Sequence, residues 1–405
     1  MHAYRPRSLT EAAAQLRELI HDSMGPSPGR SSAGSIHSDL VARFDGFATD
    51  LFGLQFEQNR VYRAFCEARG TSPGQIAHWT QIPFLPVAAF KDSDCTTLPE
   101  TNRTRVFHSS GTTQARPSRH FHSQESLVSY EDSILPWFKK HLLPDLESGG
   151  ASLFGKPSEP PDFLFLSPPP ALCQNSSLAH MFEVVRKRHA PTANLFRGKL
   201  GDDGSWSLDI PGVCSALSQA IDSLRPLCLL GTAFSFVELA DELQTYGKEV
   251  VLPHGSRALE TGGYKGRSRS MPKFELHSMI TRVLGIPAEN IVSEYGMSEL
   301  SSQAYDNTVG FIPVTKGQPP QALLPLRAFR FPPWARARIV TPEDGKEVLP
   351  GQIGILQIFD MANIFSVSAL QTEDLARWHR EGFELEGRAR FSEARGCSLN
   401  QIVNT

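Results

Sequence analysis

A run of small hydroxyl residues around a glycine is the strongest chemical signal in this chain. It reads SSGTTQ, from Ser109 to Gln114, and follows the β-like run from Arg105 to Phe107. Glycine lets the backbone come close to a polyphosphate, and hydroxyl and amide groups can donate hydrogen bonds to its oxygens. No lysine follows the glycine, as it would in a P-loop. The pattern therefore indicates a phosphate-binding turn, with a polar surface turn as the alternative.

A second segment places a hydroxyl and a carboxylate just after an apolar pair, Ile291 and Val292. It reads SEYGMSELSS and contains Ser298 next to Glu299. Hard oxygen ligands suit Mg²⁺, which usually also keeps waters and phosphate oxygens in its coordination shell. A strand that ends in such a turn predicts a place for a nucleotide and its metal ion. The alternative for Glu299 alone is a solvated carboxylate in a turn.

Two shorter signals lie near the carboxyl end. Asp374 ends the triplet Thr372-Glu373-Asp374 and could accept hydrogen bonds from ribose hydroxyls, although exposed acidic triplets are common. Arg388 follows Gly387 at the start of the last stretch, for which a basic, frayed terminus is the alternative. Neither signal is specific by itself.

The overall composition narrows the class of protein. Of the 405 residues, 40% are hydrophobic and 20% are charged, as in an ordinary soluble globular protein. A formal net charge of −3 provides no field for attracting nucleic acid, so no nucleic-acid partner is expected. No run approaches the roughly 20 apolar residues that span a membrane, and the amino terminus lacks an apolar signal-peptide stretch. Six scattered cysteines without a Cys-x-x-Cys pair indicate reduced thiols. We expect a cytoplasmic protein.

Apolar runs that alternate with helical patterns predict an α/β fold with a mainly parallel sheet. The expected strands are residues 162–167, 226–234 and 248–253, and the expected helices are residues 176–188 and 235–247. The second helix would begin with Ser235 as its N-cap and end at Gly247.

The chain divides into four parts by composition and pattern. Residues 1–36 form a helix and a flexible Gly/Pro/Ser-rich linker, so we expect that helix to be a loosely attached extension. Residues 37–310 form the α/β core, 311–386 a β-rich subdomain and 387–405 a hinge-like tail.

These segments occur in an order that resembles the adenylate-forming superfamily of acyl-CoA synthetases, peptide-synthetase adenylation domains and firefly luciferase. In that superfamily the motifs SSGTTG, YGxTE, TGD and GR follow one another along the chain. Three positions differ here: Gln114 replaces a glycine, Ser298 a threonine and Glu373 a glycine. The resemblance implies an α/β adenylate-forming large-domain fold of stacked mixed and parallel sheets flanked by helices. It also implies a small β-rich subdomain and a truncated C-terminal tail.

Within the superfamily, the chain is similar to the LuxE-type acyl-protein synthetases, the long-chain fatty acid–luciferin component ligases of bacterial bioluminescence. The similarity covers most of the chain from about residue 40 onward. It rests on the segments IPFLPVAAFK, QNSSLAHM, LGTAF, TGGYKGRSR, SEYGMSELSSQAY and RGCSL.

The resemblance implies ATP and Mg²⁺ as cofactors. It also implies a carboxylic acid as substrate, namely a long-chain fatty acid. The carboxylate would attack the α-phosphorus of ATP, and preorganised amides, cations and metal would stabilise the charge that builds on the phosphates. The phosphates would be contacted by Ser109, Ser110, Gly111, Thr112 and Thr113. The nucleotide would be flanked by Gly231, Thr232 and Ala233 and by Tyr295, Gly296 and Ser298, and its site would be completed by Asp374 and Arg388. The Mg²⁺ ion would be bound by Glu299.

Three further residues are candidates for catalysis. Most members of the superfamily end in a mobile domain of about 100 residues with a lysine for adenylation, whereas fewer than twenty residues follow Arg388. Lys265 and Arg267, in a Gly-rich segment, would supply the positive charge instead; a structural loop lysine is the alternative. Cys397 has arginines close in sequence, which lower a thiol's pKa. The resemblance implies that this cysteine takes the acyl group as a thioester and passes it to a reductase partner.

Two other functions fit part of the pattern. An acyl-CoA ligase of the phenylacetate-ligase kind shares every motif except the surroundings of Cys397 and would use coenzyme A or a carrier-protein thiol as acceptor. A non-catalytic homologue would act as a scaffold, although Ser298, Glu299, Asp374 and Arg388 are retained. The histidines have no metal-ligand spacing with cysteines, so we expect them in the core or at the surface.

Overall fold

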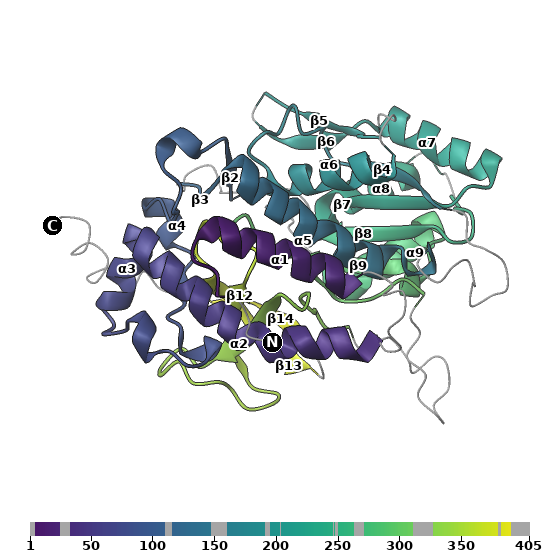
Figure 1. The fold of residues 1–405 in the computed structure, drawn as a ribbon. Helices are drawn as coiled ribbons and strands as arrows, with labels where there is room; N and C mark the ends of the chain where they lie inside the picture. The colour runs from purple at the N-terminus through teal and green to yellow at the C-terminus, as the bar shows by residue number, and fades with distance from the viewer. Residues whose placement is uncertain are drawn as a thin grey trace.

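Two five-stranded sheets organise the chain in the computed structural model (Figure 1). The structure describes residues 5–24, 33–109, 116–146, 160–190, 195–202, 204–245, 247, 250–262, 271–310, 327–379 and 382–389. Within these ranges, no helix is both long and apolar enough to cross a bilayer.

The first sheet is mainly parallel and, apart from the exposed Asp162 at the start of β4, buried, as the apolar runs predict. Its strands lie in the order β10-β9-β8-β7-β4, with β10 antiparallel to β9 and the other pairs parallel. Helices connect the parallel strands, so their carboxyl ends meet at one edge. The elements are β4 (Asp162–Leu166), α6 (Ser177–His189), α7 (Ile210–Ser223), β7 (Leu227–Thr232), α8 (Ala233–Thr245), β8 (Arg257–Thr261), α9 (Lys273–Leu284), β9 (Ile291–Tyr295) and β10 (Ala304–Tyr305).

The second sheet is mainly antiparallel and contains the predicted β-rich segment. Its order is β1-β13-β12-β11, and β14 also pairs with β13. The Pro-rich segment before α4 contributes β1, which runs parallel to β13 just ahead of the triplet that ends at Asp374. The elements are β1 (Leu85–Pro86), β11 (Ala335–Val340), β12 (Ile353–Asp360), β13 (Ala369–His379) and β14 (Gly382–Arg388).

The remaining elements cover these sheets or form small hairpins (Figure 1). They are α1 (Leu9–Met24), α2 (Ala33–Gln58), α3 (Arg60–Glu67), α4 (Ala89–Asp92), the pair β2 (Arg105–His108) and β3 (Arg119–His122), α5 (Gln124–Leu142), the pair β5 (Gly198–Leu200) and β6 (Trp206–Leu208), and short 3-10 turns at Pro73–Gln75, Trp79–Gln81, Glu100–Asn102, Pro144–Leu146 and Ala288–Asn290.

Helix α1 is firmly packed, which corrects the expectation of a loosely attached extension. It lies along α5 (Figure 1), and Leu9, Leu16 and Ile20 on its inner face are buried. Apolar residues at this spacing form one stripe of a helix, and that stripe is removed from water here. The linker after it lies largely outside the described residues.

Two details of the α/β segment differ from the sequence expectations. Residues 250–253 are not a strand: Val250 and Leu252 are buried against helices instead. The strand is β8, which the apolar pattern missed because it contains Arg257 and Glu260, both of them buried. Helix α8 begins two residues earlier than predicted, and the hydroxyl of Thr232 rather than Ser235 caps it.

Candidate active site

The carboxyl edge of the parallel sheet brings together two of the predicted nucleotide segments. Gly231 and Thr232 end β7, Ala233 opens α8, and Tyr295 ends β9 two strands away. In open α/β sheets, ligands bind at this edge. Glycine is required at position 231, since a Cβ there would lie 2.9 Å from the Cβ of Leu166.

The turn after β9 holds Ser298 and Glu299 in fixed, buried positions. The Ser298 hydroxyl donates to Oε2 of Glu299 at 3.0 Å. The main-chain carbonyl of Glu299 accepts a hydrogen bond of 2.7 Å from the Asn363 side chain. Both residues of the turn are less than a tenth exposed. Gly296, which opens this turn, is exposed, so it leaves the backbone accessible beside Tyr295.

The hairpin of β2 and β3 connects this turn to the first motif. The backbone amide of Ser118 donates to the hydroxyl of Ser109 at 2.9 Å, and the hydroxyls of Ser118 and Ser298 lie 3.3 Å apart. His120 Nδ1 lies 2.8 Å from the carbonyl of Ser298. Burial lowers the pKa of His120 to about 4, so its imidazole is neutral near pH 7 and Nδ1–H is the donor. The start of the first motif therefore lies beside the second.

The third and fourth motifs meet the second through one carboxylate. The hydroxyl of Tyr295 donates to Oδ2 of Asp374 at 2.7 Å, and Nε of Arg388 donates to Oδ1 at 3.2 Å. Asp374 and Arg388 are direct cross-strand neighbours on β13 and β14. The Asp374 side chain is 16% exposed, so it remains within reach of a ligand.

The Tyr295 ring is set in an aromatic cluster. Its centroid lies 5.9 Å from that of Phe329 and 5.7 Å from that of Phe383. Edge-on and tilted aromatic contacts at this range are favourable. They fix the ring at the carboxyl end of β9 while its hydroxyl contacts Asp374.

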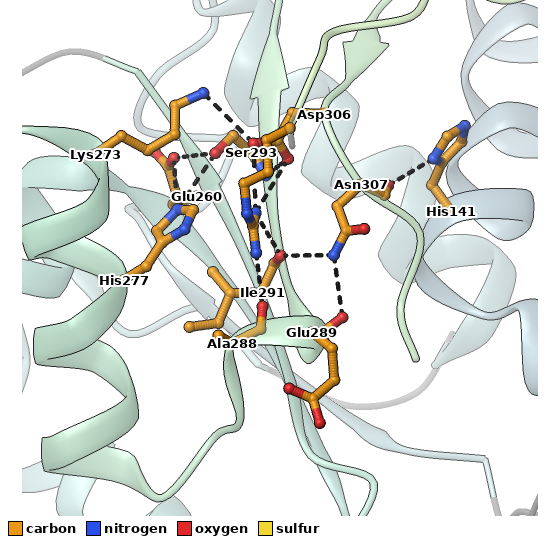
Figure 2. A network of polar contacts seen from close by, with 11 residues as sticks. His141, Glu260, Lys273, His277, Ala288, Glu289, Ile291, Ser293, Asp306 and Asn307 are labelled. Atoms are coloured by element: carbon orange, nitrogen blue, oxygen red, sulfur yellow. Dashed lines mark hydrogen bonds and ion pairs between the residues drawn. The ribbon is translucent and has the colours of Figure 1, made fainter. Parts of the chain in front are cut away.

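A buried polar network holds the middle of β9 (Figure 2). Ser293 donates its hydroxyl to Glu260 on β8, and His277 Nε2 on α9 lies 3.3 Å from the same carboxylate oxygen. All three residues are at most 5% exposed. Buried polar groups are costly unless they are paired. This pairing therefore ties β9 to β8 and α9 in one arrangement.

A buried ion pair holds the same strand on its other side. Asp306 accepts a 2.7 Å hydrogen bond from the backbone amide of Ser293, and Nζ of Lys273 lies 3.4 Å from its carboxylate (Figure 2). The guanidinium of Arg327 lies 3.3 Å from the same carboxylate. Burial would raise the pKa of Asp306, but Lys273, Arg327, His277 and the backbone amide of Ser293 together outweigh it and lower the pKa to about 2. Asp306 is therefore charged at all moderate pH values.

One buried carboxylate that the motifs do not reveal supports the turn that holds Ser298 and Glu299. Asp360, at the end of β12, is fully buried and accepts hydrogen bonds of 2.9 and 2.8 Å from the backbone amides of Ser301 and Ser302. It also accepts from the Ser302 hydroxyl at 2.7 Å and from the Ala362 amide at 2.9 Å. A single aspartate after an apolar strand carries no pattern that would have predicted this.

Several predicted residues lie outside the described ranges. They are Ser110, Gly111, Thr112 and Thr113 of the first motif, and the three candidate catalytic residues Lys265, Arg267 and Cys397. Their roles remain predictions. Six of the other site residues form two groups of connected contacts. One group links Ser109, through Ser118, to Ser298 and Glu299. The other links Tyr295, Asp374 and Arg388, so each group contains part of the segment from Tyr295 to Glu299.

Comparison with known proteins places the fold. No protein-family model and no curated protein sequence matches the chain. Among solved structures, 2-hydroxyisobutyryl-CoA ligase in an open conformation, in complex with 2-HIB-AMP and CoA, is similar, with a TM-score of 0.58 and 13% identity over 91% of this chain and 80% of that chain. The same ligase in its postadenylation state with 2-HIB-AMP gives a TM-score of 0.58 and 13% identity over 91% and 73%. The chain therefore shares the fold of this ligase over most of its length.

Proposed function

We propose that this chain activates a carboxylic acid with ATP and transfers the acyl group to a thiol. A carboxylate oxygen attacks the α-phosphorus, the bond to the bridging oxygen of pyrophosphate breaks, and an acyl-adenylate forms. A thiolate then attacks the acyl carbon, and AMP leaves. The proposed enzyme is an AMP-forming acid–thiol ligase of the acyl-protein synthetase type, and the expected acid is a long-chain fatty acid.

The contacts around Tyr295, Ser298 and Asp374 are the observation that carries the proposal. Residues far apart in the chain meet at the carboxyl edge of a parallel sheet, in a fold whose similar ligase binds an acyl-AMP. Asp374 would accept hydrogen bonds from the ribose hydroxyls, and Tyr295 would pack beside the adenine. The phosphates would lie toward Ser109 and the residues that follow it.

Glu299 fits the expected metal ion. Its carboxylate is a hard oxygen ligand, and only one of its oxygens accepts the hydrogen bond from Ser298. Mg²⁺ takes one or two carboxylates together with phosphate oxygens and waters. When bound, it would neutralise the charge that builds on the phosphates. Glu299 holds its position for this through the buried turn.

Cys397 is the proposed acyl acceptor within the chain, and a reductase is the proposed next acceptor. Lys265 and Arg267 are proposed to stabilise the phosphate charge during adenylation. Undiminished adenylation by a Lys265→Ala variant would exclude the lysine from that role. Cytoplasmic localisation agrees with thiol chemistry, since thiols stay reduced there.

ATP–pyrophosphate exchange against a panel of carboxylic acids tests the proposed first half-reaction. We expect exchange with at least one acid and its loss by about 100-fold or more in Glu299→Gln, because the metal ligand is removed. Glu289→Gln is the matched control: it changes a carboxylate that precedes β9 and leaves the turn intact. No exchange with any acid, with ATP and Mg²⁺ saturating, would exclude an adenylating enzyme and favour a scaffold.

Intact-mass measurement tests the acceptor. With ATP and a competent acid, we expect one acyl mass on the peptide that contains Cys397, and none in Cys397→Ser. The spectator Cys214→Ser variant, which removes a half-buried helix thiol, should still be acylated. A coenzyme A thioester without acylated protein would select the acyl-CoA ligase alternative.

A further inference from the structure

Three polar side chains form a row across adjacent strands at the carboxyl edge of the parallel sheet. In the strand register, Thr261 on β8 pairs with Glu294 on β9, and Glu294 pairs with Tyr305 on β10. Register partners on neighbouring strands point to the same face of a sheet. This hydroxyl, carboxyl and phenol row therefore lies together on one face, immediately before Tyr295 and Gly296.

The row is buried, yet one of its members lacks a partner. Tyr305 is 0% exposed, and its hydroxyl has no hydrogen-bond partner within the described part of the chain. Glu294 is 6% exposed and accepts a hydrogen bond from Thr261. An unpaired buried hydroxyl costs about 1–3 kcal/mol, so native proteins seldom retain one without a ligand or water to satisfy it.

Side chains from α5 and from the β2–β3 hairpin lie near this row. Tyr130 on α5 interacts electrostatically with both Glu294 and Tyr305. The ring of His122 lies 6.0 Å from that of Tyr130, and its Nε2 is also buried without a partner in these segments. Two buried polar atoms in the described part of this region therefore lack a hydrogen-bond partner.

We propose that the row of Thr261, Glu294 and Tyr305 binds a hydroxyl group that the substrate acid carries near its carboxylate. This rests on the proposed adenylation at the adjacent turn. It narrows the expected fatty acid to a hydroxy-substituted one.

The position and chemistry of the row give the reason. Its central residue, Glu294, lies against Gly296, where an added Cβ would clash with the Glu294 Oε1 atom. Gly296 opens the turn that holds Ser298 and Glu299, so a hydroxyl bound at the row would lie close to the proposed site of adenylation. A hydroxyl both donates and accepts: it donates to an oxygen of Glu294 and accepts from the phenol of Tyr305. Burial raises the pKa of Glu294 to about 7, which disfavours a fixed charge and suits a neutral ligand group.

Matched acid pairs test the proposal. ATP–pyrophosphate exchange is measured with unsubstituted, 2-hydroxy and 3-hydroxy acids of equal length, at short, medium and long chain lengths. For the wild type we expect kcat/KM for one hydroxy acid to exceed that of its unsubstituted partner by about tenfold or more. Tyr305→Phe and Thr261→Val should each lower that ratio, Tyr305→Phe by about tenfold.

A control separates a local effect from general destabilisation. Tyr62→Phe removes another fully buried phenol, whose hydroxyl donates to the Pro83 carbonyl at 2.8 Å; it should keep the wild-type ratio. Exchange that is best with unsubstituted acids, or an unchanged ratio in Tyr305→Phe, would overturn the hydroxy-acid inference and leave adenylation standing. Exchange with no acid at all would overturn both.

Discussion

Ser298 lies where three segments of the chain meet. Its hydroxyl contacts Ser118 and Glu299, and its carbonyl accepts from His120. Threonine is usual at this position in the superfamily that the motif resembles, and serine supplies the same hydroxyl with a smaller volume. Asp374 connects the other motifs in the same way, since its carboxylate accepts hydrogen bonds from both Tyr295 and Arg388.

Asp374→Asn should weaken nucleotide binding. Asparagine still accepts from Tyr295, but it has one acceptor oxygen instead of two and carries no charge for Arg388. We expect KM for ATP in the exchange assay to rise by about tenfold, because hydrogen bonds to charged groups contribute about 1.5–3 kcal/mol. Glu384→Gln, in the exposed Arg377 pair of the same hairpin, should leave KM unchanged. An unchanged KM in Asp374→Asn would remove the residue from the nucleotide site.

Glu294 predicts a specific pH dependence of stability. Burial raises its pKa from 4.5 to about 7, so the folded state binds a proton that the unfolded state releases between those values. The stabilisation is complete below about pH 4.5 and is lost as pH rises to about 7, with an upper bound of about 3 kcal/mol. In Glu294→Gln, the free energy of unfolding by urea should lack this decline between pH 5 and 8. A variant with the wild-type slope would show that Glu294 is ionised in the folded protein throughout.

At the level of elements, the turn that holds Ser298 and Glu299 depends on strands of the other sheet. Asp360 ends β12 and holds Ser301 and Ser302, while Asn363 in the following loop binds the carbonyl of Glu299. The parallel sheet provides the strand that leads into the turn, and the antiparallel sheet fixes its far end. The position of Glu299 therefore depends on how the two sheets pack.

Asp360→Asn should loosen this connection. The amide group would present donor hydrogens to backbone amides that need acceptors, so we expect a loss of about 2 kcal/mol in the free energy of unfolding. We also expect a lower kcat for exchange, because Glu299 would be less well placed. Asp344→Asn changes an exposed carboxylate in the β11–β12 turn and should leave the free energy of unfolding nearly unchanged. Equal effects of the two substitutions would contradict a supporting role for Asp360.

Much of this element layout follows from the sequence, with identifiable exceptions. Strands β4 and β7 and helix α6 are confirmed because uninterrupted apolar runs and a serine N-cap give clear local signals. Strand β8 was missed because the charges of Arg257 and Glu260 are paired only by residues distant in sequence, Asp145 and His277. The contacts of Ser298 with Ser118 and His120 also cannot be predicted from the sequence, since they depend on how the β2–β3 hairpin packs against the sheet.

At the scale of the whole molecule, the amino-terminal helix is part of the structure that surrounds the site. Helix α1 packs along α5, and α5 carries Tyr130, which faces the polar row on the sheet. Helix α5 in turn contacts the parallel sheet, because the ring centroid of His141 on α5 lies 5.2 Å from that of Tyr305 on β10. Removing apolar contacts of α1 should therefore disturb the position of α5 beside the residues that we propose bind the acid.

Leu16→Ala tests this dependence. Leu16 is 0% exposed on the inner face of α1, and truncating a buried leucine to alanine costs about 2–5 kcal/mol through lost contacts and a cavity. We expect a loss in that range by urea denaturation. We also expect a raised KM for the acid with less change in KM for ATP, because Tyr130 on α5 interacts with Glu294 and Tyr305. Glu18→Ala, on the exposed side of the same helix, should change neither quantity. If Leu16→Ala instead produces a separate unfolding transition at a lower urea concentration and leaves KM for the acid unchanged, then α1 unfolds by itself and does not support the site.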